Sequence, residues 1–506
     1  MSSARTMKEL LQRGDETAVA LAAPECEPLN FAELRQHVDN TVAKLNSLGI
    51  GRNDPVAIVL PNGPCMASAF MSIAAGATTA PLNPAYTADE YEFYLADLGT
   101  KVLVVEKGSD SPVRDAAGKL GLNVIELVPS SAKAGLFQLV GDPVNDPPEQ
   151  GGSAAADDVA LVLHTSGTTS RPKIVPLSHA NICTTAENIK QSLKLVPADR
   201  CLNVMPLFHI HGLMAAVLGS LGAGASVFCT PGFNALKFFG WMKEAIPTWY
   251  TAVPTMHQAI LSRAARNPEV IESVRLRLIR SSSASLPPQI MQKLEETFGT
   301  PVIESYGMTE AAHQMSSNPL PPRPRKPGAV GVAAGPEVAI MDQEGQLLPS
   351  GSVGEVVIRG PNVTAGYQNN PQANATAFTN GWFRTGDQGV IDDEQYLRLT
   401  GRLKEIINRG GEKISPREVD EILMDHPEVI QAVTFAMPHE KLGEDVAAAL
   451  VLREGAKLTE RELREFASSR LAAFKVPRRV VFLDEIPKGP TGKLQRIGLA
   501  EKLGLT

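Results

Sequence analysis

The sequence predicts an α/β protein of more than one domain, in which a mostly parallel sheet forms the larger part. Three observations predict this class. The chain has 506 residues, which is too long for a single hydrophobic core. Strand-like and helix-like patterns alternate through its first two thirds, as they do in βαβ units. Turns and short alternating strands follow from about Gly328 to Arg402, and a compact α+β unit completes the chain.

Helices and strands alternate in the first third. Asn30 and Glu33 form a capping box that opens a helix with one apolar stripe. The stripe consists of Phe31, Leu34, Val38, Val42 and Leu45. The next expected elements are a strand at 55–60, a helix near 66–75, a helix from Thr87 and Glu90 to Gly99, and a strand at 101–106. Their polar composition and Pro/Gly-rich end predict that residues 107–157 are variable surface.

The middle third continues this alternation and places polar residues where strands end. Strands are expected at 249–253, 276–280 and 301–304, and a helix at 287–298 begins with prolines and stops at Gly299. The polar runs are Ser281–Ser285 and Ser305–Glu310. Because ligand crevices in open α/β sheets lie at the carboxyl ends of strands, these runs predict one shared site.

The last third changes character near residue 402, where we expect a domain boundary. Before it, strands are expected at 354–359 and 396–400. After it, Ser415, Pro416 and Glu418 open a helix, and Thr459 with Glu462 opens another. Strands are expected at 431–436 and 446–452.

A loop rich in hydroxyl groups follows the apolar run at 159–163. It reads Thr165-Ser166-Gly167-Thr168-Thr169-Ser170-Arg171-Pro172-Lys173. Hydroxyls, backbone N–H groups and two cations after a strand suit a polyphosphate. The loop is not a Walker A motif, because Pro172 and Pro176 prevent the helix that such a motif requires. The same prolines oppose a Ser170–Lys173 acyl-enzyme pair, which needs a helical turn.

Composition excludes several classes. A net charge of −7 offers no electrostatic surface for nucleic acid or an anionic membrane. The five cysteines lack paired or metal-ligand spacing, which suits a reducing compartment. The N-terminus has no apolar signal core, and the uncharged stretch at 212–229 contains five glycines and favours a buried helix and strand over a membrane span. We therefore expect a cytoplasmic protein.

Several motifs, in order along nearly the whole chain, resemble those of the adenylate-forming (acyl-CoA synthetase) superfamily. Besides the hydroxyl-rich loop, they are Pro206–Gly212, Tyr306–Glu310, Thr385–Asp387, Gly401–Pro416 and Lys488–Lys493. The resemblance implies a large N-terminal domain of two α/β subdomains plus a β-rich one, followed by a small mobile α+β domain. The implied boundaries are 1–401, a hinge at 402–404 and 405–506. The implied reaction joins a carboxylate to AMP, releases pyrophosphate and then forms a thioester with coenzyme A.

The resemblance also assigns residues, and the chemistry explains the assignments. Attack of a carboxylate on the α-phosphorus accumulates negative charge, so cations and Mg²⁺ should carry the catalysis. Lys493, Thr309 and His209 are the expected catalytic residues, and Glu310 is the expected Mg²⁺ ligand. The residues expected to bind ATP or coenzyme A are Thr165, Ser166, Gly167, Thr168, Thr169, Lys173, Ser283, Ala284, Ser285, Glu304, Ser305, Tyr306, Gly307, Met308, Asp387, Arg402, Gly410, Gly411, Lys413 and Phe474.

Two of these assignments have plain structural alternatives. Asp387 and Arg402 would hold the ribose hydroxyls, but Arg402 alone reads equally well as part of a structural ion pair. Gly410 and Gly411 would let the backbone approach pantetheine, but they are also consistent with a simple turn. A departure from the family pattern is Ile174, which stands where a glycine commonly follows Lys173.

Polar residues near the expected acid pocket indicate the substrate. His209, His313 and Ser283 would supply donors where a fatty-acyl tunnel needs apolar side chains, so they suit a short acid with a second carboxylate. The segments 81–95, 249–258, 313–321 and 408–416 resemble the oxalate–CoA ligases of plants and fungi. This resemblance implies that oxalate, ATP and coenzyme A are the substrates. The expected assembly is a monomer or homodimer.

Three alternatives remain open at this point. The first is a ligase for another short, medium-chain or aromatic acid. The second is a nucleotide-binding regulatory protein that kept the fold without the chemistry. The third is an acyl hydrolase that uses Ser170 and Lys173.

Overall fold

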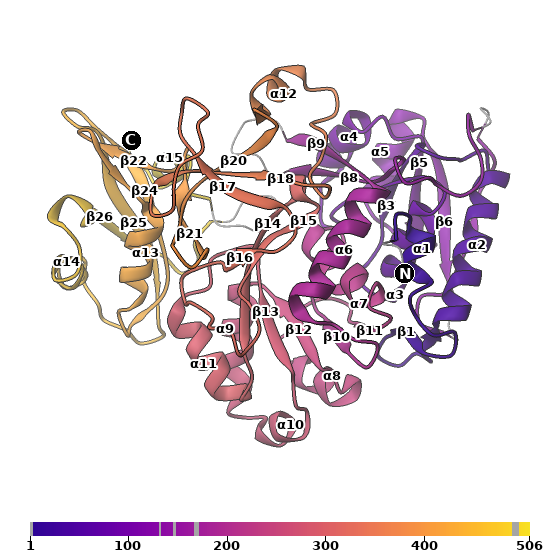
Figure 1. The fold of residues 1–506 in the computed structure, drawn as a ribbon, viewed down its shortest axis with the longest axis horizontal. Coiled ribbons are helices and arrows are strands. Elements are labelled where there is room, and N and C mark those ends of the chain that lie inside the picture. The colour runs from indigo at the N-terminus through magenta and orange to yellow at the C-terminus, as the bar shows by residue number, and fades with distance from the viewer. Residues whose placement is uncertain (1–3, 131–132, 145–147, 166–171, 488–494, 506) are drawn as a thin grey trace. The chain divides into compact units, whose positions relative to one another are not determined.

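The computed structural model describes residues 4–130, 133–144, 148–165, 172–487 and 495–505 (Figure 1). These residues form two compact units. The first contains the described parts of Met1–Thr165, Lys173–Val338 and Ile358–Ala377. The second contains mainly Ala339–Val357 and the described part of Phe378–Thr506. No helix in the described part of the chain has the length and apolarity that a membrane crossing requires.

The first unit contains a nine-stranded sheet in the order β16-β15-β14-β13-β12-β10-β11-β1-β2. Its strands are β1 (Val19–Ala22), β2 (Leu29–Asn30), β10 (Arg200–Asn203), β11 (Ser226–Cys229), β12 (Trp249–Ala252), β13 (Leu278–Ser281), β14 (Val302–Met308), β15 (His313–Ser317) and β16 (Val332–Ala333). The neighbours from β1 to β14 are parallel, and β2, β15 and β16 add antiparallel edges. The predicted parallel sheet is confirmed, although β14 runs four residues past the predicted end at 304.

The first unit also contains a seven-stranded sheet in the order β7-β6-β5-β3-β4-β8-β9. Its strands are β3 (Pro55–Val59), β4 (Thr78–Pro81), β5 (Val102–Glu106), β6 (Asn123–Pro129), β7 (Phe137–Val140), β8 (Val159–Thr165) and β9 (Lys173–Ser178). The prediction that residues 107–157 are only variable surface is wrong. A helix, α5 (Val113–Leu120), and the strands β6 and β7 lie there, because Ile125, Leu127, Phe137 and Leu139 are buried at alternate positions of the two strands.

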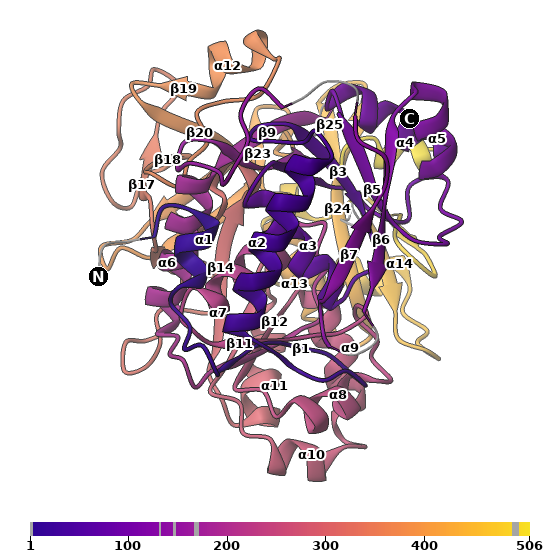
Figure 2. The same ribbon diagram turned by 90° about the vertical axis from the view of Figure 1, so that its right-hand side faces the viewer.

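The helices expected from Asn30, near 66–75, from Thr87 to Gly99 and at 287–298 are present in the first unit, but the bounds of most of its other helices were not predicted. The helices of this unit are α1 (Met7–Leu11), α2 (Phe31–Ser47), α3 (Pro64–Ala74), α4 (Ala88–Asp97), α5, α6 (His179–Leu193), the π-helix η1 (His211–Leu218), α7 (Gly219–Leu221), α8 (Phe238–Ala245), α9 (Pro254–Ala264), α10 (Pro268–Ser273), α11 (Pro288–Phe298), the short 3₁₀ turn η2 (Thr309–Ala311) and α12 (Pro371–Ala377). The capping box of α2 is confirmed, and its apolar stripe is buried. Figure 2 shows α2 beside α3, with which it packs.

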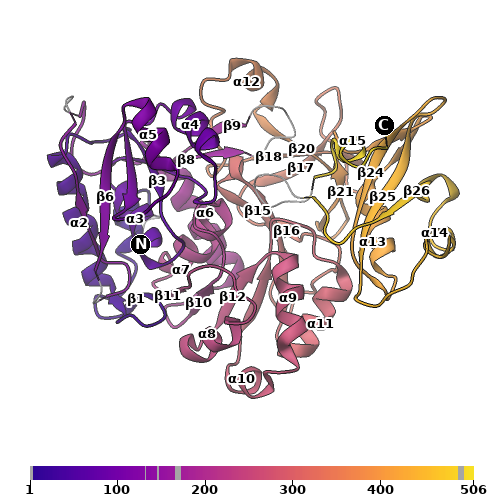
Figure 3. The ribbon, with the colours of Figure 1, turned by 180° about the vertical axis from the view of Figure 1, so that it is seen from behind.

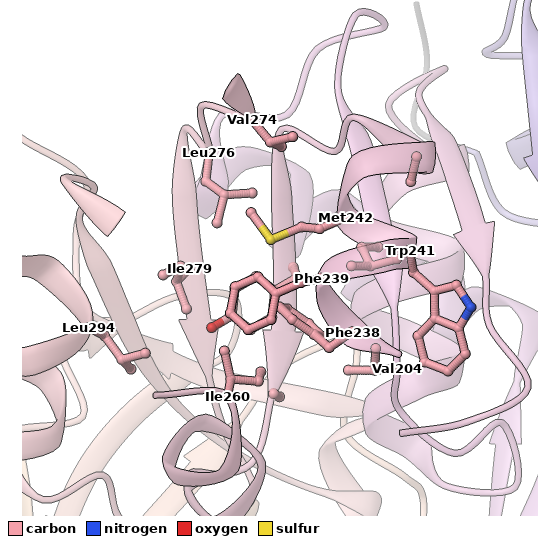
Figure 4. Packing of buried hydrophobic residues seen from close by; sticks show 14 of the residues in the cluster. Val204, Phe238, Phe239, Trp241, Met242, Ile260, Val274, Leu276, Ile279 and Leu294 are labelled. Carbon is pink, nitrogen blue, oxygen red and sulfur yellow. The ribbon is translucent and has the colours of Figure 1, made fainter. Parts of the chain in front are cut away.

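An apolar cluster covers one face of β12 and β13 (Figure 4). Phe238 and Met242 of α8, Ile260 of α9 and Leu294 of α11 pack there around Ile279. Since successive side chains of a strand point to opposite faces, Ile279 in this cluster directs the next residue, Arg280, to the other face. The core therefore fixes where Arg280 points.

The second unit contains two five-stranded sheets. The first has β17 (Glu337–Met341) and β18 (Val353–Arg359), which extend across the boundary between the units, with β19 (Phe378–Thr379), β20 (Trp382–Ile391) and β21 (Leu397–Arg402). The second has β22 (Ile407–Arg409), β23 (Glu412–Ile414), β24 (Val429–His439), β25 (Gly443–Leu452) and β26 (Arg479–Phe482). Figure 3 shows α13 (Pro416–Met424) and α14 (Glu460–Ser468) with these strands. The chain also forms a short 3₁₀ turn, η3 (Ala473–Lys475), and ends in α15 (Leu499–Lys502).

A buried ion pair joins three segments of this second unit. Arg496 donates to Asp420 Oδ2 of α13 at 2.6 Å and to the Thr434 carbonyl of β24 at 2.8 Å. Its Nε also lies 3.3 Å from Glu405 Oε2. Only 4% of Asp420 is exposed, so this carboxylate depends on Arg496 and on the Thr434 N–H, which donates to its Oδ1 at 2.5 Å, in place of water.

We expect Asp420→Ala to lower the free energy of unfolding by about 3 kcal/mol, because it removes the buried partner of Arg496 and leaves this partly buried guanidinium with Glu405 alone as a carboxylate partner among the described residues. Urea denaturation monitored by circular dichroism measures the change. The matched control is Glu465→Ala, which removes an exposed ion pair with Arg461 and should cost at most about 1 kcal/mol. Equal effects of the two substitutions would contradict the structural role of the buried pair.

Candidate active site

Two neighbouring parallel strands of the nine-stranded sheet, β13 and β14, end in polar residues beside the end of β12. Ala252 pairs with Ser281, and Ser281 pairs with Glu304, so the carboxyl ends of β12, β13 and β14 lie side by side. The hydroxyl of Ser282 donates to the Ser305 carbonyl at 3.0 Å. The structure thus brings together the two polar runs that the sequence predicted to share a site.

A buried cluster of two histidines and an arginine lies next to this edge. Nη1 of Arg280 lies 3.2 Å from Nε2 of His211, and its Nη2 lies 3.0 Å from Nε2 of His313. The two imidazole rings stack with centroids 5.0 Å apart. Nε2 of His211 also lies 2.6 Å from the hydroxyl oxygen of Thr251. Arg280 and His211 are completely buried, and His313 is 2% exposed.

Burial determines the charges in this cluster. Burial lowers the pKa of Arg280 to about 9, which leaves the guanidinium charged at neutral pH. Burial, together with the neighbouring His313 and Arg280, holds the pKa of His211 well below its usual range. His211 is therefore a neutral hydrogen-bonding group beside a buried cation.

Ser283 connects this cluster to the loop after β13. Its Oγ lies 3.0 Å from Nδ1 of His211, and its backbone adopts φ = 71°, a left-handed conformation that is uncommon for residues other than glycine. Glu304, which is 1% exposed, accepts a hydrogen bond from the Leu286 N–H at 2.9 Å and so holds the far end of the same loop. Ala284 is exposed and Ser285 is half-buried.

Gly307 allows the close pairing that places His313. The strands β14 and β15 form an antiparallel pair in which Gly307 faces Gln314 and Met308 faces His313. A Cβ atom at Gly307 would lie 1.7 Å from the His313 carbonyl oxygen. His313 itself has φ = 100° and follows Ala312 at φ = 48°. The position of the imidazole therefore depends on a glycine and on two strained backbone conformations.

A second group of contacts surrounds Glu310, which lies in η2 just after β14. Only 6% of Glu310 is exposed, and its Oε1 accepts a hydrogen bond from the Tyr367 hydroxyl at 2.9 Å. Nζ of Lys173 lies 4.3 Å from the centroid of the Tyr367 ring. Lys173 opens β9, where it pairs with Thr165, and the next residue, Ile174, accepts a hydrogen bond from the Gln368 N–H at 2.9 Å. The strand that follows the hydroxyl-rich loop is thus tied to the segment carrying Tyr367.

The predicted nucleotide and coenzyme A residues of the second unit occupy local structures of their own. Nε of Arg402 lies 3.0 Å from Oδ1 of the buried Asp387, so the ion pair considered from the sequence is present. Gly410 and Gly411 form the turn between β22 and β23 with φ of 60° and 100°. Lys413 is exposed, and Phe474 packs partly against the apolar core of this unit. The predicted residues Ser166, Gly167, Thr168, Thr169 and Lys493 lie outside the described residues.

Profiles of two known domains match this chain. The AMP-binding enzyme profile matches residues 8–368, and the AMP-binding enzyme C-terminal domain profile matches residues 418–493. The chain belongs to the AMP-binding enzyme family. The predicted family is thus confirmed. The predicted fold class, in which a large N-terminal domain is followed by a small C-terminal domain, is confirmed as well.

Curated relatives of this AMP-binding enzyme include ligases of small acids. The oxalate–CoA ligase of Arabidopsis thaliana is 48% identical over 483 residues, which cover 92% of this chain and 92% of that protein. The oxalate–CoA ligase of Saccharomyces cerevisiae is 44% identical over 475 residues, which cover 89% of this chain and 87% of that protein. The sulfoacetate–CoA ligase of Cupriavidus necator is 34% identical over 93% of this chain and 92% of that protein. The crystal structure of ATP-bound MatB from Rhodopseudomonas palustris aligns with a TM-score of 0.88 at 29% identity over 98% of both chains.

The prediction from sequence named His209, His313 and Ser283 and missed three further residues of this AMP-binding enzyme. His211 is the ring that contacts Ser283, whereas His209 lies two residues earlier and accepts a hydrogen bond from the His211 N–H through Nδ1. Arg280 and Tyr367 were not predicted either. An arginine inside the apolar strand Leu278–Ser281 was a visible signal, because a charged residue is rarely buried in a strand without a purpose.

We expect Gly307→Ala to lower the free energy of unfolding by about 1–3 kcal/mol, because a Cβ atom 1.7 Å from the His313 carbonyl forces β14 and β15 apart. Thermal and urea unfolding measure this loss. The control is Gly118→Ala in α5, where no atom lies within 4 Å of the new Cβ and where alanine should stabilise the helix by roughly 1 kcal/mol. Unchanged stability of Gly307→Ala would show that the two strands separate without cost.

Proposed function

We propose that this protein activates oxalate with ATP to form oxalyl-AMP and pyrophosphate, and then transfers the oxalyl group to coenzyme A to give oxalyl-CoA and AMP. The observation that carries the proposal is the 48% identity with an oxalate–CoA ligase over 92% of both chains. A second oxalate–CoA ligase at 44% identity supports the same substrate.

The chemistry of the buried cluster agrees with an acid that carries a second negative charge. Arg280 is a buried cation whose hydrogen-bond partners are His211, Thr251, His313 and Gln314, none of which is a carboxylate. A cation of this kind favours an anion nearby, whereas a hydrocarbon chain would leave it uncompensated. Ser283 and His313 are the residues that we propose to hold the distal carboxylate, with His209 at the border of the pocket.

Adenylate formation places negative charge on the α-phosphate as the acid attacks. In our proposal, Lys493 lies between the attacking carboxylate and this phosphate, and Thr309 contacts the same phosphate. Thr165 to Thr169 and Lys173 hold the pyrophosphate that leaves. Asp387 and Arg402 hold the ribose, and the stretch from Glu304 to Met308, with Ser283, Ala284 and Ser285, contacts the nucleotide. Coenzyme A is bound, in this proposal, by Gly410, Gly411, Lys413 and Phe474.

Glu310 is the residue that we propose to hold Mg²⁺. Among the described residues, no group of three or more His, Cys, Asp and Glu side chains could hold a metal by itself. A single carboxylate fits Mg²⁺ nevertheless, because this ion usually keeps water ligands and takes substrate phosphates besides one or two carboxylates. When bound, the ion would neutralise phosphate charge. The Tyr367 hydroxyl orients Glu310 for this purpose.

Three further predictions from the sequence remain proposals. They are the domain boundaries 1–401, 402–404 and 405–506, the cytoplasmic location, and the monomeric or homodimeric state. In family members with a mobile small domain, its movement would allow coenzyme A to occupy the region that Lys493 uses in the first step.

A second candidate substrate is sulfoacetate, because a sulfoacetate–CoA ligase is 34% identical to this chain. Sulfoacetate, like oxalate, presents an anionic group besides its reacting carboxylate. The two candidates therefore share the requirement for a buried cation and differ in the shape of the distal anion.

We expect oxalate to give the highest kcat/KM in a panel that also contains sulfoacetate, malonate, a medium-chain fatty acid and coumarate. Pyrophosphate release with Mg²⁺, ATP and coenzyme A measures each rate, and mass spectrometry identifies the thioester. Acetate is the matched control, since it is as short as oxalate and lacks the second charge. A higher kcat/KM for coumarate or the fatty acid than for oxalate would refute the proposal.

We expect Tyr367→Phe to raise the Mg²⁺ concentration for half-maximal activity about tenfold or more, because Glu310 loses the donor that orients it. The rate of pyrophosphate release across a magnesium titration measures this shift. Tyr91→Phe is the control, since Tyr91 is also a buried tyrosine but donates to the Asn83 carbonyl away from the site. The role of Tyr367 is disproved if both variants keep the wild-type titration.

A further inference from the structure

Arg280 differs from Arg277 and Arg496 in its partners. Arg277, in the same segment, donates to the buried Asp199 carboxylate at 2.9 Å, and Arg496 donates to Asp420 at 2.6 Å. Arg280 is completely buried, yet its described partners are two imidazoles, a hydroxyl and an amide oxygen. A cation buried without a carboxylate costs stability, so a task that a neutral residue could not perform would account for an arginine at this position.

The hydrogen-bond geometry assigns the protons on the two imidazoles. A guanidinium has donors and no acceptor, so the Nε2 atoms at 3.2 Å and 3.0 Å must accept from it. The Thr251 hydroxyl, 2.6 Å from Nε2 of His211, then shares the single lone pair of this nitrogen with the guanidinium. A proton on Nε2 of His313 would instead place two N–H donors against each other. Each neutral ring therefore carries its proton on Nδ1.

We propose that Arg280 is a positioning residue for the acid substrate, because its two hydrogen bonds hold His211 and His313 as the neutral tautomer protonated on Nδ1. Nδ1–H of His211 then donates to Ser283 Oγ at 3.0 Å. The Ser283 hydroxyl, having accepted this bond, directs its own proton elsewhere, and a carboxylate of the substrate is a suitable acceptor. His313 stacks on this ring with centroids 5.0 Å apart, so a fixed His313 also holds His211 in place.

This relay explains why the cluster uses an arginine. A lysine is a point charge that cannot reach both rings with a fixed pair of donors. Ser283 is half-buried and stands at the start of the loop beyond β13, so it can meet a ligand while His211 stays completely buried. Arg280 thus acts on the substrate through the rings, and it need not touch the acid itself.

The inference rests on the proposed function, since the acid is the anion that the Ser283 hydroxyl receives. The direct test is ¹⁵N NMR of the wild-type enzyme labelled at histidine, without ATP or acid, with signals assigned through His211→Asn and His313→Asn. Nε2 of both rings should appear as unprotonated, hydrogen-bonded nitrogen and Nδ1 as protonated nitrogen. A proton on Nε2 of either ring would overturn the inference.

The kinetic test uses Arg280→Lys, which keeps a positive charge and removes the paired donors. We expect its KM for oxalate to rise about tenfold or more, as for a lost hydrogen bond to a charged group, while the KM for ATP stays unchanged. Ser283→Ala should raise the KM for oxalate in the same way, and it keeps the test decisive if Arg280→Lys fails to fold. The control Arg277→Lys, whose arginine pairs with Asp199, should leave the KM for oxalate unchanged.

The outcomes separate the two proposals. Wild-type enzyme that turns over oxalate but has an oxalate KM unaffected by Arg280→Lys and by Ser283→Ala would overturn the positioning role alone. An equal rise in the KM values for oxalate and ATP in Arg280→Lys would mark a general structural defect and also overturn it. Wild-type enzyme with the expected tautomers but without oxalate-dependent pyrophosphate release would overturn the proposed substrate and leave the proton assignment standing.

Discussion

The solvation of one buried guanidinium is the constraint around which the candidate site is arranged. Ile279 belongs to the apolar cluster on one face of β13, so the strand delivers Arg280 to the opposite face, where water does not reach it. Everything that the described chain offers Arg280 there is neutral: two imidazoles, the hydroxyl of Thr251 and the amide of Gln314. Because neutral acceptors compensate a cation only in part, the surroundings retain an affinity for negative charge. The polar ends of β13 and β14 lie next to this region, so they too lie where negative charge is favoured.

Unusual backbone conformations gather at the same place. Ser283, Ala312 and His313 all have positive φ, and Gly307 occupies a position where a Cβ atom would overlap a carbonyl oxygen. Such conformations cost of order 1–3 kcal/mol each and persist only where the surrounding fold enforces them. Here the enforcement comes from the pairing of β14 with β15 and from Glu304, which holds the backbone of Leu286. The site is therefore held in shape by rigid elements, which limits how far its hydrogen-bonding groups can adjust to a different acid.

Much of this fold can be read from the sequence, and the failures have identifiable causes. Capping residues such as Asn30 and Thr459 and the alternation of strands and helices carry local information, so the elements they mark are found. Residues 107–157 were misjudged because the polar and Pro/Gly-rich turns in this stretch obscured β6 and β7, which are short and bury only every second residue. In the site, motifs led to Glu310, Ser283 and His313. His211, Arg280 and Tyr367 depend on contacts between distant segments: Tyr367 lies 57 residues from Glu310, and Arg280 lies 69 residues from His211. The choice between His209 and His211 also depends on a π-helix that begins at His211, for which the sequence carries no simple signature.

The contacts of Arg496 have a consequence for recombination between relatives. This guanidinium contacts Glu405 before β22, Asp420 of α13 and the Thr434 carbonyl of β24, and it lies 62 or more residues beyond all three along the chain. A crossover placed between any two of them would join an arginine from one parent to carboxylates from another, and a mismatch would leave a charge buried without its counterion. Hybrid enzymes made from this protein should therefore inherit residues 405–496 from a single parent.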